Sequence, residues 1–217
     1  MYISHLERVH CTSTAFCLSN DIVFPVPYPA KTDRQKILAA ALEQLYRNGL
    51  RRMSLRALAG TLGLAPNALY RYFADRAQLE AALAGEAASR LHTVLRRATG
   101  RKTPEEAIRS MARAYLRFAR EEQPLYEIMM TCPAGDENPT AHEQLWAFVV
   151  EQVTRLSGTA HAREAAVALW AFLHGMTALE AAQVFGEQKP TKSFDFGLDS
   201  WLTTVARPTT RHKRPSR

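Results

Sequence analysis

Residues 53–79 read MSLRALAGTLGLAPNALYRYFADRAQL and contain two short helical patterns separated by a turn. Ser54 is a suitable cap for a short helix that turns Leu58 and its apolar neighbours inward. Gly63 marks a turn, and Pro66 then opens a second short helix, because the amide that proline lacks has no helical partner at that position. The pattern extends this second helix to about Tyr72. Two short helices joined by a glycine turn are typical of a helix-turn-helix unit, whose second helix enters the major groove of DNA.

The second short helix has an apolar side and a polar side. Its apolar residues face the leucines of the first helix and leave an outer side formed by Asn67, Ala68, Arg71 and Tyr72. Asparagine can hydrogen-bond an adenine edge at two points, alanine can contact a thymine methyl group, and arginine or tyrosine can hold phosphates. An ordinary small helical bundle with a glycine turn explains the spacing alone equally well.

Helical periodicity continues on both sides of this unit. Upstream, Asp33 caps a predicted helix whose apolar residues recur every three or four positions until Gly49. Downstream, caps and breaks predict six further helices over about 76–98, 104–123, 125–130, 140–157, 161–185 and 194–206. Because no segment alternates apolar and polar residues with a period of two, the predicted fold class is all-α, with about nine helices.

The formal net charge of +7 is concentrated in two places. Residues 30–85 carry nine Lys and Arg against four Asp and Glu, and residues 206–217 carry five Lys and Arg and no acidic residue. A compact basic segment suits a polyanionic partner, although basic clusters are also common on solvated faces. The basic end is expected to be a disordered, solubilising tail, with non-specific contact to DNA as the alternative.

The composition, 47% hydrophobic and 23% charged, is that of a soluble globular protein. No apolar run approaches the roughly 20 residues that span a bilayer, and the N-terminus lacks the pattern of a signal peptide. A cytoplasmic protein without a membrane partner is therefore expected. Cys11, Cys17 and Cys132 have neither CxxC nor zinc-ligand spacing, so no disulfide framework or structural metal is indicated. Redox sensing stays open as an alternative.

The stretch 53–79 resembles the DNA-binding region of the TetR/AcrR family, above all in the run from Leu69 to Phe73 and the following Asp75-Arg76-x-x-Leu79. This resemblance implies a transcriptional regulator that binds double-stranded DNA, with no enzymatic activity and no cofactor. It also implies phosphate contacts by Ser54, Tyr70, Tyr72 and Arg76 and base contacts by Asn67, Ala68 and Arg71. Two departures are evident: Ala65 replaces a frequent Ser or Thr cap, and Asn67 replaces a frequent Gly.

The segment from Trp170 to Glu180 resembles the Trp-His-Gly segment of one TetR C-terminal subgroup, and 115–119 and 124–130 are similar to that subgroup's fifth and sixth helices. The resemblance implies a homodimer in which the last two long helices pack against their symmetry mates, the final one starting near Phe196-Gly197-Leu198-Asp199. Independently, the helix predicted over 161–185 is apolar around most of its circumference. Gly175 and Ala178 would permit close helix approach there.

A cavity among the C-terminal helices is predicted to hold a small-molecule effector. Its candidate lining residues are Tyr115, Phe118, Met129, Met130, Trp146, Trp170 and His174, the last as a polar anchor. For each of them taken separately, an ordinary core position is the stronger explanation. Metal binding by His142, His161 and His174 is not expected, because these residues lack paired ligand spacing.

The expected organisation is a flexible N-terminal arm (1–29), a helix-turn-helix domain (30–78), a ligand-binding and dimerisation domain (79–206) and the basic tail (207–217). The arm could equally be a remnant preceding a shorter natural start. We expect a repressor that binds a palindromic operator as a homodimer and is released by an effector. The alternatives are a ligand-independent DNA-binding protein of the same fold and a helical enzyme. Against the enzyme, the sequence offers no nucleophile and base pair, metal-ligand motif or phosphate-binding glycine loop.

Overall fold

The computed structural model describes residues 32–131 and 139–206. The predicted arm, the basic tail and all three cysteines lie outside these residues. All regular structure in the described ranges is helical, which confirms the all-α fold class. The helices are α1 (Arg34–Asn48), the 3-10 helix η1 (Leu50–Arg52), α2 (Leu55–Thr61), α3 (Pro66–Leu69), α4 (Arg76–Thr99), α5 (Pro104–Glu121), α6 (Gln123–Thr131), α7 (Pro139–Ser157), α8 (Ala162–Ala181) and α9 (Thr191–Val205).

Side-chain caps begin several helices where the sequence predicts them. The carboxylates of Asp33 and Asp75 each accept a hydrogen bond of 2.8 Å from the amide three residues later, at the start of α1 and α4. Thr103 and Glu106 form a reciprocal capping box at the start of α5. These caps satisfy amides that have no partner within the helix, which is why local sequence fixes these helix starts.

Two helices end earlier than the sequence predicts. α3 ends at Leu69 rather than near Tyr72, because the amides of Tyr72 and Phe73 both donate to the Leu69 carbonyl and close a tight turn. α8 ends at Ala181 instead of continuing to residue 185. There Gln183 takes a left-handed conformation (φ 55°), and the amide of Val184 donates to the Leu179 carbonyl, as in a Schellman cap.

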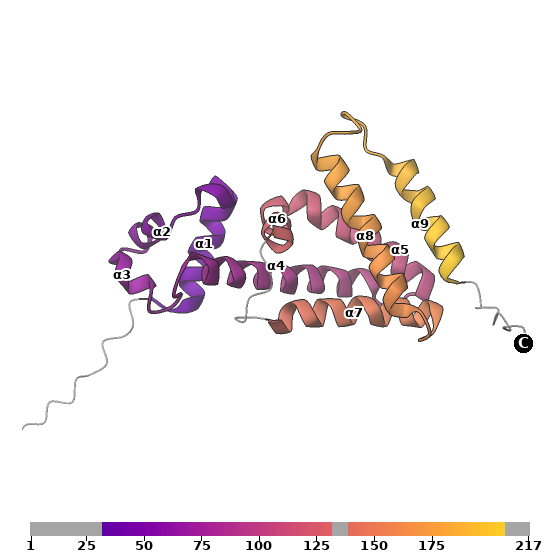
Figure 1. The fold of residues 1–217 in the computed structure, drawn as a ribbon, viewed down its shortest axis with the longest axis horizontal. Coiled ribbons are helices and arrows are strands. Elements are labelled where there is room, and N and C mark those ends of the chain that lie inside the picture. Colours follow the sequence, from indigo (N-terminus) through magenta and orange to yellow (C-terminus); the bar gives the residue numbers. More distant parts are fainter. Residues whose placement is uncertain (1–31, 132–138, 207–217) are drawn as a thin grey trace, which may run out of the picture. The chain divides into compact units, whose positions relative to one another are not determined.

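α4 joins the helix-turn-helix unit to the remaining helices. Its beginning packs against α1, and the rest of its length contacts α5, α6 and α7 (Figure 1). Because α4 runs from residue 76 to residue 99, it crosses the expected domain boundary between 78 and 79 without a break. A single cluster of buried hydrophobic residues extends from α1 through α4 to α9.

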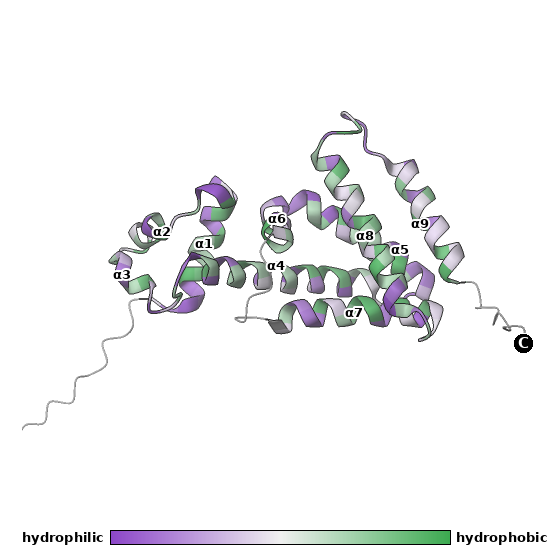
Figure 2. Ribbon diagram, in the orientation of Figure 1, coloured by the Kyte–Doolittle hydropathy of each residue, from purple (hydrophilic) through white to green (hydrophobic). Residues whose placement is uncertain are grey.

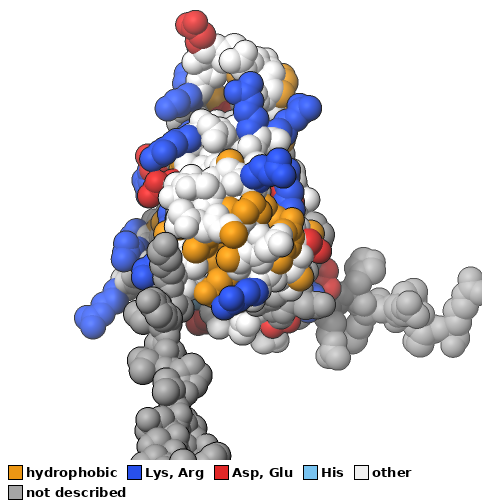
Figure 3. Space-filling view, turned by 90° about the vertical axis from the view of Figure 1, so that its left-hand side faces the viewer, with side chains coloured by type: hydrophobic (Ala, Val, Ile, Leu, Met, Phe, Trp, Pro, Cys, Tyr) orange, Lys and Arg blue, Asp and Glu red, His pale blue; other side chains and the backbone are white. Residues whose placement is uncertain are grey.

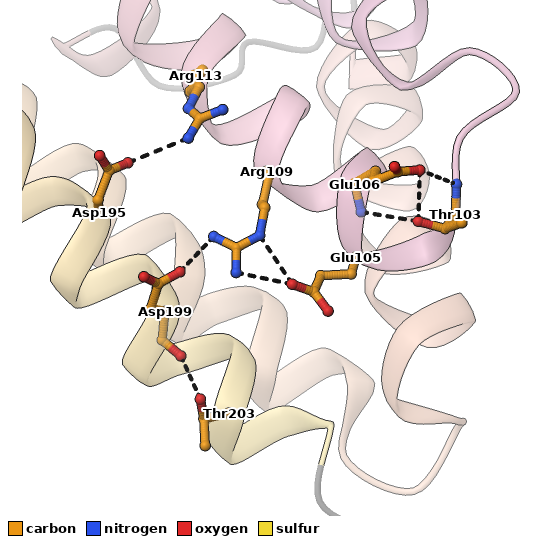
Figure 4. A network of polar contacts seen from close by, with 8 residues as sticks. All are labelled: Thr103, Glu105, Glu106, Arg109, Arg113, Asp195, Asp199 and Thr203. Atoms are coloured by element: carbon orange, nitrogen blue, oxygen red, sulfur yellow. Dashed lines mark hydrogen bonds and ion pairs between the residues drawn. The ribbon is translucent and has the colours of Figure 1, made fainter.

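α9 packs on α8 and is tied to α5 by ion pairs. Arg109 of α5 bonds both Glu105 and Asp199, and Arg113 lies 3.4 Å from Asp195 one turn earlier in α9 (Figure 4). Both acidic partners are therefore oriented toward α5. The opposite side of α9 has no such contact among the described residues.

α9 begins at Thr191, so the predicted start at residue 194 is too late and Phe196 to Asp199 lie inside the helix. Gly197 faces Phe172 of α8 so closely that an added methyl carbon would lie 2.5 Å from the phenyl ring. The ring of Phe172 in turn stacks on Phe194, with centroids 5.9 Å apart. Gly197 thus permits the close approach of α8 and α9.

Candidate DNA-binding surface and ligand pocket

The short helix α3 is anchored from behind and exposed in front. Leu69 and Phe73 are 0% and 1% exposed, and they pack into the core of the helix-turn-helix unit. Asn67 and Arg71 are exposed, and Tyr70 keeps 52% of its surface accessible. Ala68 is half-buried, and Ala65 provides no side-chain cap for α3. The structure therefore brings Asn67, Tyr70 and Arg71 together on one accessible surface.

Tyr72 differs from the expectation that it faces outward. It is half-buried, and its hydroxyl donates a 3.0 Å hydrogen bond to the carbonyl of Thr32, just before α1. The reason is the tight turn after Leu69, which directs residue 72 back toward the start of α1. In this conformation Tyr72 braces the unit internally.

Two other predicted phosphate contacts already have partners within the protein. The Ser54 hydroxyl accepts from the amide of Ala57 and caps α2. The Arg76 guanidinium is exposed, yet it bonds the Glu80 carboxylate at 2.6 Å and the Leu50 carbonyl at 3.0 Å. Contact with a phosphate would require Arg76 to exchange these partners.

Sequence reasoning missed three basic residues near this surface. Arg51 and Arg52 of η1 and Arg56 of α2 are exposed, and none of them pairs with a carboxylate in the part of the chain that the structure describes. Figure 3 views the molecule from the side that carries α2 and α3 and shows Lys and Arg side chains spread over it. The charge count over residues 30–85 was the available signal, but charge alone does not show which arginines reach the surface.

A cavity of about 430 Å³ lies among α4, α5, α6, α7 and α8. Six of the seven predicted residues line it, namely Tyr115, Met129, Met130, Trp146, Trp170 and His174. Phe118 does not: it is 4% exposed and borders a separate groove between α4 and α5. Phe118 lies three residues after Tyr115 on the continuous helix α5, so the two side chains are offset by about 60° around the helix axis, and Phe118 borders the groove instead of the cavity.

The remaining lining residues were not predicted. They are Leu91 and Leu95 of α4, Met111 of α5, His142, Leu145 and Val149 of α7, and Leu169 and Leu173 of α8. Most are aliphatic residues at ordinary helical spacing, so nothing in the sequence separates them from the rest of the core. No Asp, Glu, Lys or Arg side chain from the described ranges lines the cavity.

Four polar side chains form a hydrogen-bonded network beside the cavity. The Tyr126 hydroxyl lies 3.1 Å from the Tyr115 hydroxyl, 2.7 Å from Nδ1 of His174 and 2.7 Å from the Thr177 hydroxyl. Thr177 also donates to the His174 carbonyl at 2.8 Å. Burial, together with the neighbouring Tyr126, raises the pKa of Tyr115. Tyr126 and Thr177 were not predicted, because their roles depend on α6 and α8 meeting.

A second polar contact joins α1 to the junction of α5 and α6. The Tyr46 hydroxyl donates to the Glu122 carboxylate, and burial together with this bond raises the pKa of Tyr46 to about 12. The Glu122 carbonyl accepts from the amide of Tyr126 at 2.9 Å. Glu122, which contacts α1, and Tyr126, at the centre of the cavity network, therefore belong to the same helical turn.

Hydrophobic side chains remain exposed on α8, on α9 and on the connection between them. Phe196 of α9 is 75% exposed and Val184 is 61% exposed, and Val167, Trp170 and Leu179 of α8 are each more than 40% exposed. Figure 2 shows hydrophobic residues recurring along α8. An added methyl group at Gly175 would meet nothing within 4 Å, so this face is open within the single chain.

Two negative findings concern the described residues alone. Residues 32–131 and 139–206 contain no group of three or more His, Cys, Asp or Glu that could hold a metal ion. Nor does any helix in those ranges have the length and apolar character needed to cross a membrane.

Comparisons with known proteins agree with this geometry. Residues 37–83 match the family model of bacterial regulatory proteins of the tetR family, and residues 108–201 match the tetracyclin repressor-like C-terminal domain. An uncharacterized HTH-type transcriptional regulator of Mycobacterium tuberculosis is 30% identical over 166 residues, which cover 75% of this chain and 76% of that protein.

Solved structures share the fold. A protein of unknown function from Rhodococcus sp. RHA1 has a TM-score of 0.71 and 26% identity, covering 84% of this chain and all of that one. A TetR variant from Acinetobacter baumannii AYE, in complex with minocycline, has a TM-score of 0.59 and 23% identity, covering 80% of this chain and 96% of that one. The matched helix-turn-helix and C-terminal regions, taken with the Mycobacterium relative, show that this chain belongs to the TetR family of DNA-binding transcriptional regulators.

Proposed function

We propose that this regulator is a repressor that binds a palindromic operator as a homodimer and is released when a small molecule enters the cavity. Residues 30–78 bind DNA, and residues 79–206 bind the effector and dimerise. The observation that carries the proposal is the pairing of an accessible α3 surface with a largely apolar cavity of about 430 Å³, which is lined in part by residues of α4 and α6. The cavity favours an effector-responsive protein over a ligand-independent one, whose core would be filled.

At the DNA, Asn67, Ala68 and Arg71 read base edges in the major groove. Ser54, Tyr70 and Arg76 hold phosphates, and Arg51, Arg52 and Arg56 add positive charge beside them. Tyr72 contributes indirectly, by holding the turn after α3 through its bond to Thr32. An operator contact by its hydroxyl would first require that bond to break.

Dimerisation uses the hydrophobic faces of α8 and α9. Side chains as exposed as Phe196, Val184 and Val167 are unfavourable in water, and packing them against a second copy buries them. A two-fold axis through this face would place two copies of α3 on one side of the dimer, as a palindromic operator requires. The Trp170-to-Gly175 segment, within the matched C-terminal region, further suggests the Trp-His-Gly subgroup.

Release from the operator would be transmitted through the helical turn that contains Glu122 and Tyr126. A ligand that displaces Tyr126 moves the start of α6, and the Glu122 contact transmits the shift to Tyr46 of α1. A change in the orientation of α1 and α4 then alters the spacing of the two α3 helices. The DNA-bound population falls because the ligand favours the other conformation.

The operator assignment is tested by selecting duplexes from a random pool and measuring mobility shifts at fixed salt. Tyr70→Phe should weaken binding to every duplex, whereas Asn67→Ala should change the order of preference among duplexes by about 1–3 kcal/mol at one position. Unchanged affinity and preference in both variants would reject the assignment of α3 as the reading helix.

The dimer is tested with Phe196→Asp, followed by analytical ultracentrifugation. Phe196 is mostly exposed in the single chain, so we expect the variant to fold but to sediment as a monomer and to lose operator affinity. Thr93→Asp, an added charge at an exposed position of α4 outside the proposed interface, is a matched control. A Phe196→Asp protein that remains dimeric would place the interface elsewhere.

A further inference from the structure

The polar network beside the cavity fixes where its protons lie. It contains four contacts: Tyr115 to Tyr126, Tyr126 to Nδ1 of His174, Tyr126 to Thr177, and Thr177 to the His174 carbonyl. Each hydrogen bond needs one proton. The three hydroxyl groups supply three protons, so the fourth must come from the imidazole ring.

The position of each proton follows in turn. A carbonyl oxygen only accepts, so the Thr177 hydroxyl must donate its proton to the His174 carbonyl. The Tyr126 proton must then be donated to the Thr177 oxygen, 2.7 Å away. The Tyr126 oxygen is left to accept from the Tyr115 hydroxyl and from Nδ1–H of His174. Every other placement leaves two oxygen or nitrogen lone pairs facing each other at hydrogen-bonding distance.

With the proton at Nδ1, the other ring nitrogen of His174, Nε2, is left without one. A neutral imidazole protonated at Nδ1 carries a lone pair at Nε2, which accepts and does not donate. Among the residues that the structure describes, Nε2 has no hydrogen-bond partner, and His174 lines the cavity. The Tyr115 hydroxyl has already donated its proton to Tyr126, so its oxygen can only accept. The network therefore offers the cavity an acceptor.

We propose that the cavity selects an uncharged, mainly aromatic or aliphatic ligand that carries one hydrogen-bond donor, a hydroxyl or N–H group, directed at Nε2 of His174. This inference rests on the proposed effector site. The volume of about 430 Å³ suits a small organic molecule. Apart from His142 and His174, the described lining is aliphatic, aromatic and methionine-rich. It contains no Asp, Glu, Lys or Arg, so a charged ligand would be desolvated without a carboxylate, ammonium or guanidinium counter-ion.

Thr177 determines this preference without contacting the ligand, because it is 6% exposed and does not line the cavity. Replacing it with valine removes one hydroxyl while keeping its shape. The Tyr126 proton then has no oxygen partner on α8 and can be donated to Nδ1, which moves the ring proton to Nε2. Thr177→Val should therefore weaken the preference for donors, and Thr177→Ser should preserve it.

The test is calorimetric titration of the full chain at pH 7.5 with three probes that share one ring system: 2-naphthol, 2-methoxynaphthalene and 2-naphthoate. We expect 2-naphthol to bind about tenfold more tightly than the ether, and the carboxylate to bind most weakly. In Thr177→Val, the affinity for 2-naphthol divided by the affinity for the ether should fall from about ten to between about one and about three. Thr177→Ser should retain the wild-type ratio. Nitrogen-15 histidine spectra of the ligand-free protein should show the Nδ1–H form of His174.

Equal binding of 2-naphthol and the ether by the wild-type protein, or an Nε2–H ring in the spectra, overturns the donor preference and leaves the effector site intact. No binding of any probe overturns both the preference and the effector site. Operator binding, measured separately by mobility shift, is independent of all three results.

Discussion

The α3 surface and the cavity differ in where their polar side chains lie and in what those side chains bond. At α3 the apolar residues Leu69 and Phe73 are buried, and the polar side chains of Asn67 and Arg71 are left facing solvent. In the cavity the apolar side chains line the open space, and the polar groups are bonded mainly to one another. A surface that reads a polar duplex needs unsatisfied hydrogen-bonding groups, whereas a site for an apolar ligand must have few. The comparison predicts that equivalent substitutions have different effects in the two regions.

The largest effect on stability is expected behind α3. Phe73→Ala removes a side chain that is 1% exposed and should lower the free energy of unfolding by about 3–5 kcal/mol. Asn67→Ala, on the exposed side of the same helix, should change it by less than about 0.5 kcal/mol. Urea denaturation of both variants measures the difference. Similar losses in both would mean that α3 is not supported from behind in this way.

An intermediate effect is expected from removing one hydroxyl group in each region. Tyr126→Phe deprives both His174 and Thr177 of a partner in a partly buried network, which should cost about 1–3 kcal/mol of unfolding free energy. Tyr70→Phe removes an exposed hydroxyl and should leave stability almost unchanged. Thermal or urea unfolding of the matched pair checks the contrast, and equal stability of the two variants would contradict it.

The smallest effect on stability is expected where the two regions are linked. Tyr46→Phe removes a partly exposed hydrogen bond to Glu122, so the free energy of unfolding should change by less than about 1 kcal/mol. Its effect should appear in regulation. With 2-naphthol as the probe ligand, the decrease in operator affinity should be smaller than in the wild-type protein, as measured by mobility shift with and without ligand. Glu43→Gln, on the same helix, is a suitable control, and an unaltered ligand response in Tyr46→Phe would exclude this route.

Sequence reasoning predicted the features that depend on near neighbours in the chain. Asp33, Asp75 and Thr103 cap helices as expected, and the all-α fold and the helix-turn-helix region follow from caps, turns and apolar spacing. Six of the seven predicted residues line the cavity. The individual DNA contacts remain predictions. Tyr72 and Phe118 are placed differently. The tight turn after Leu69 directs Tyr72 toward Thr32, and Phe118 borders the groove between α4 and α5 rather than the cavity.

Local sequence was sufficient to place the starts of the capped helices α1, α4 and α5, because each cap involves residues only a few positions apart, whereas the start of the uncapped α9 was misplaced. Tertiary structure alone decided that Tyr126 meets Thr177, 51 positions away, and that Tyr46 meets Glu122 across 76 positions. It likewise decided which apolar residues surround a cavity and which, such as Phe196, stay exposed. These outcomes depend on the angles and distances at which helices pack, and those are set by the summed contacts of many side chains rather than by any local pattern.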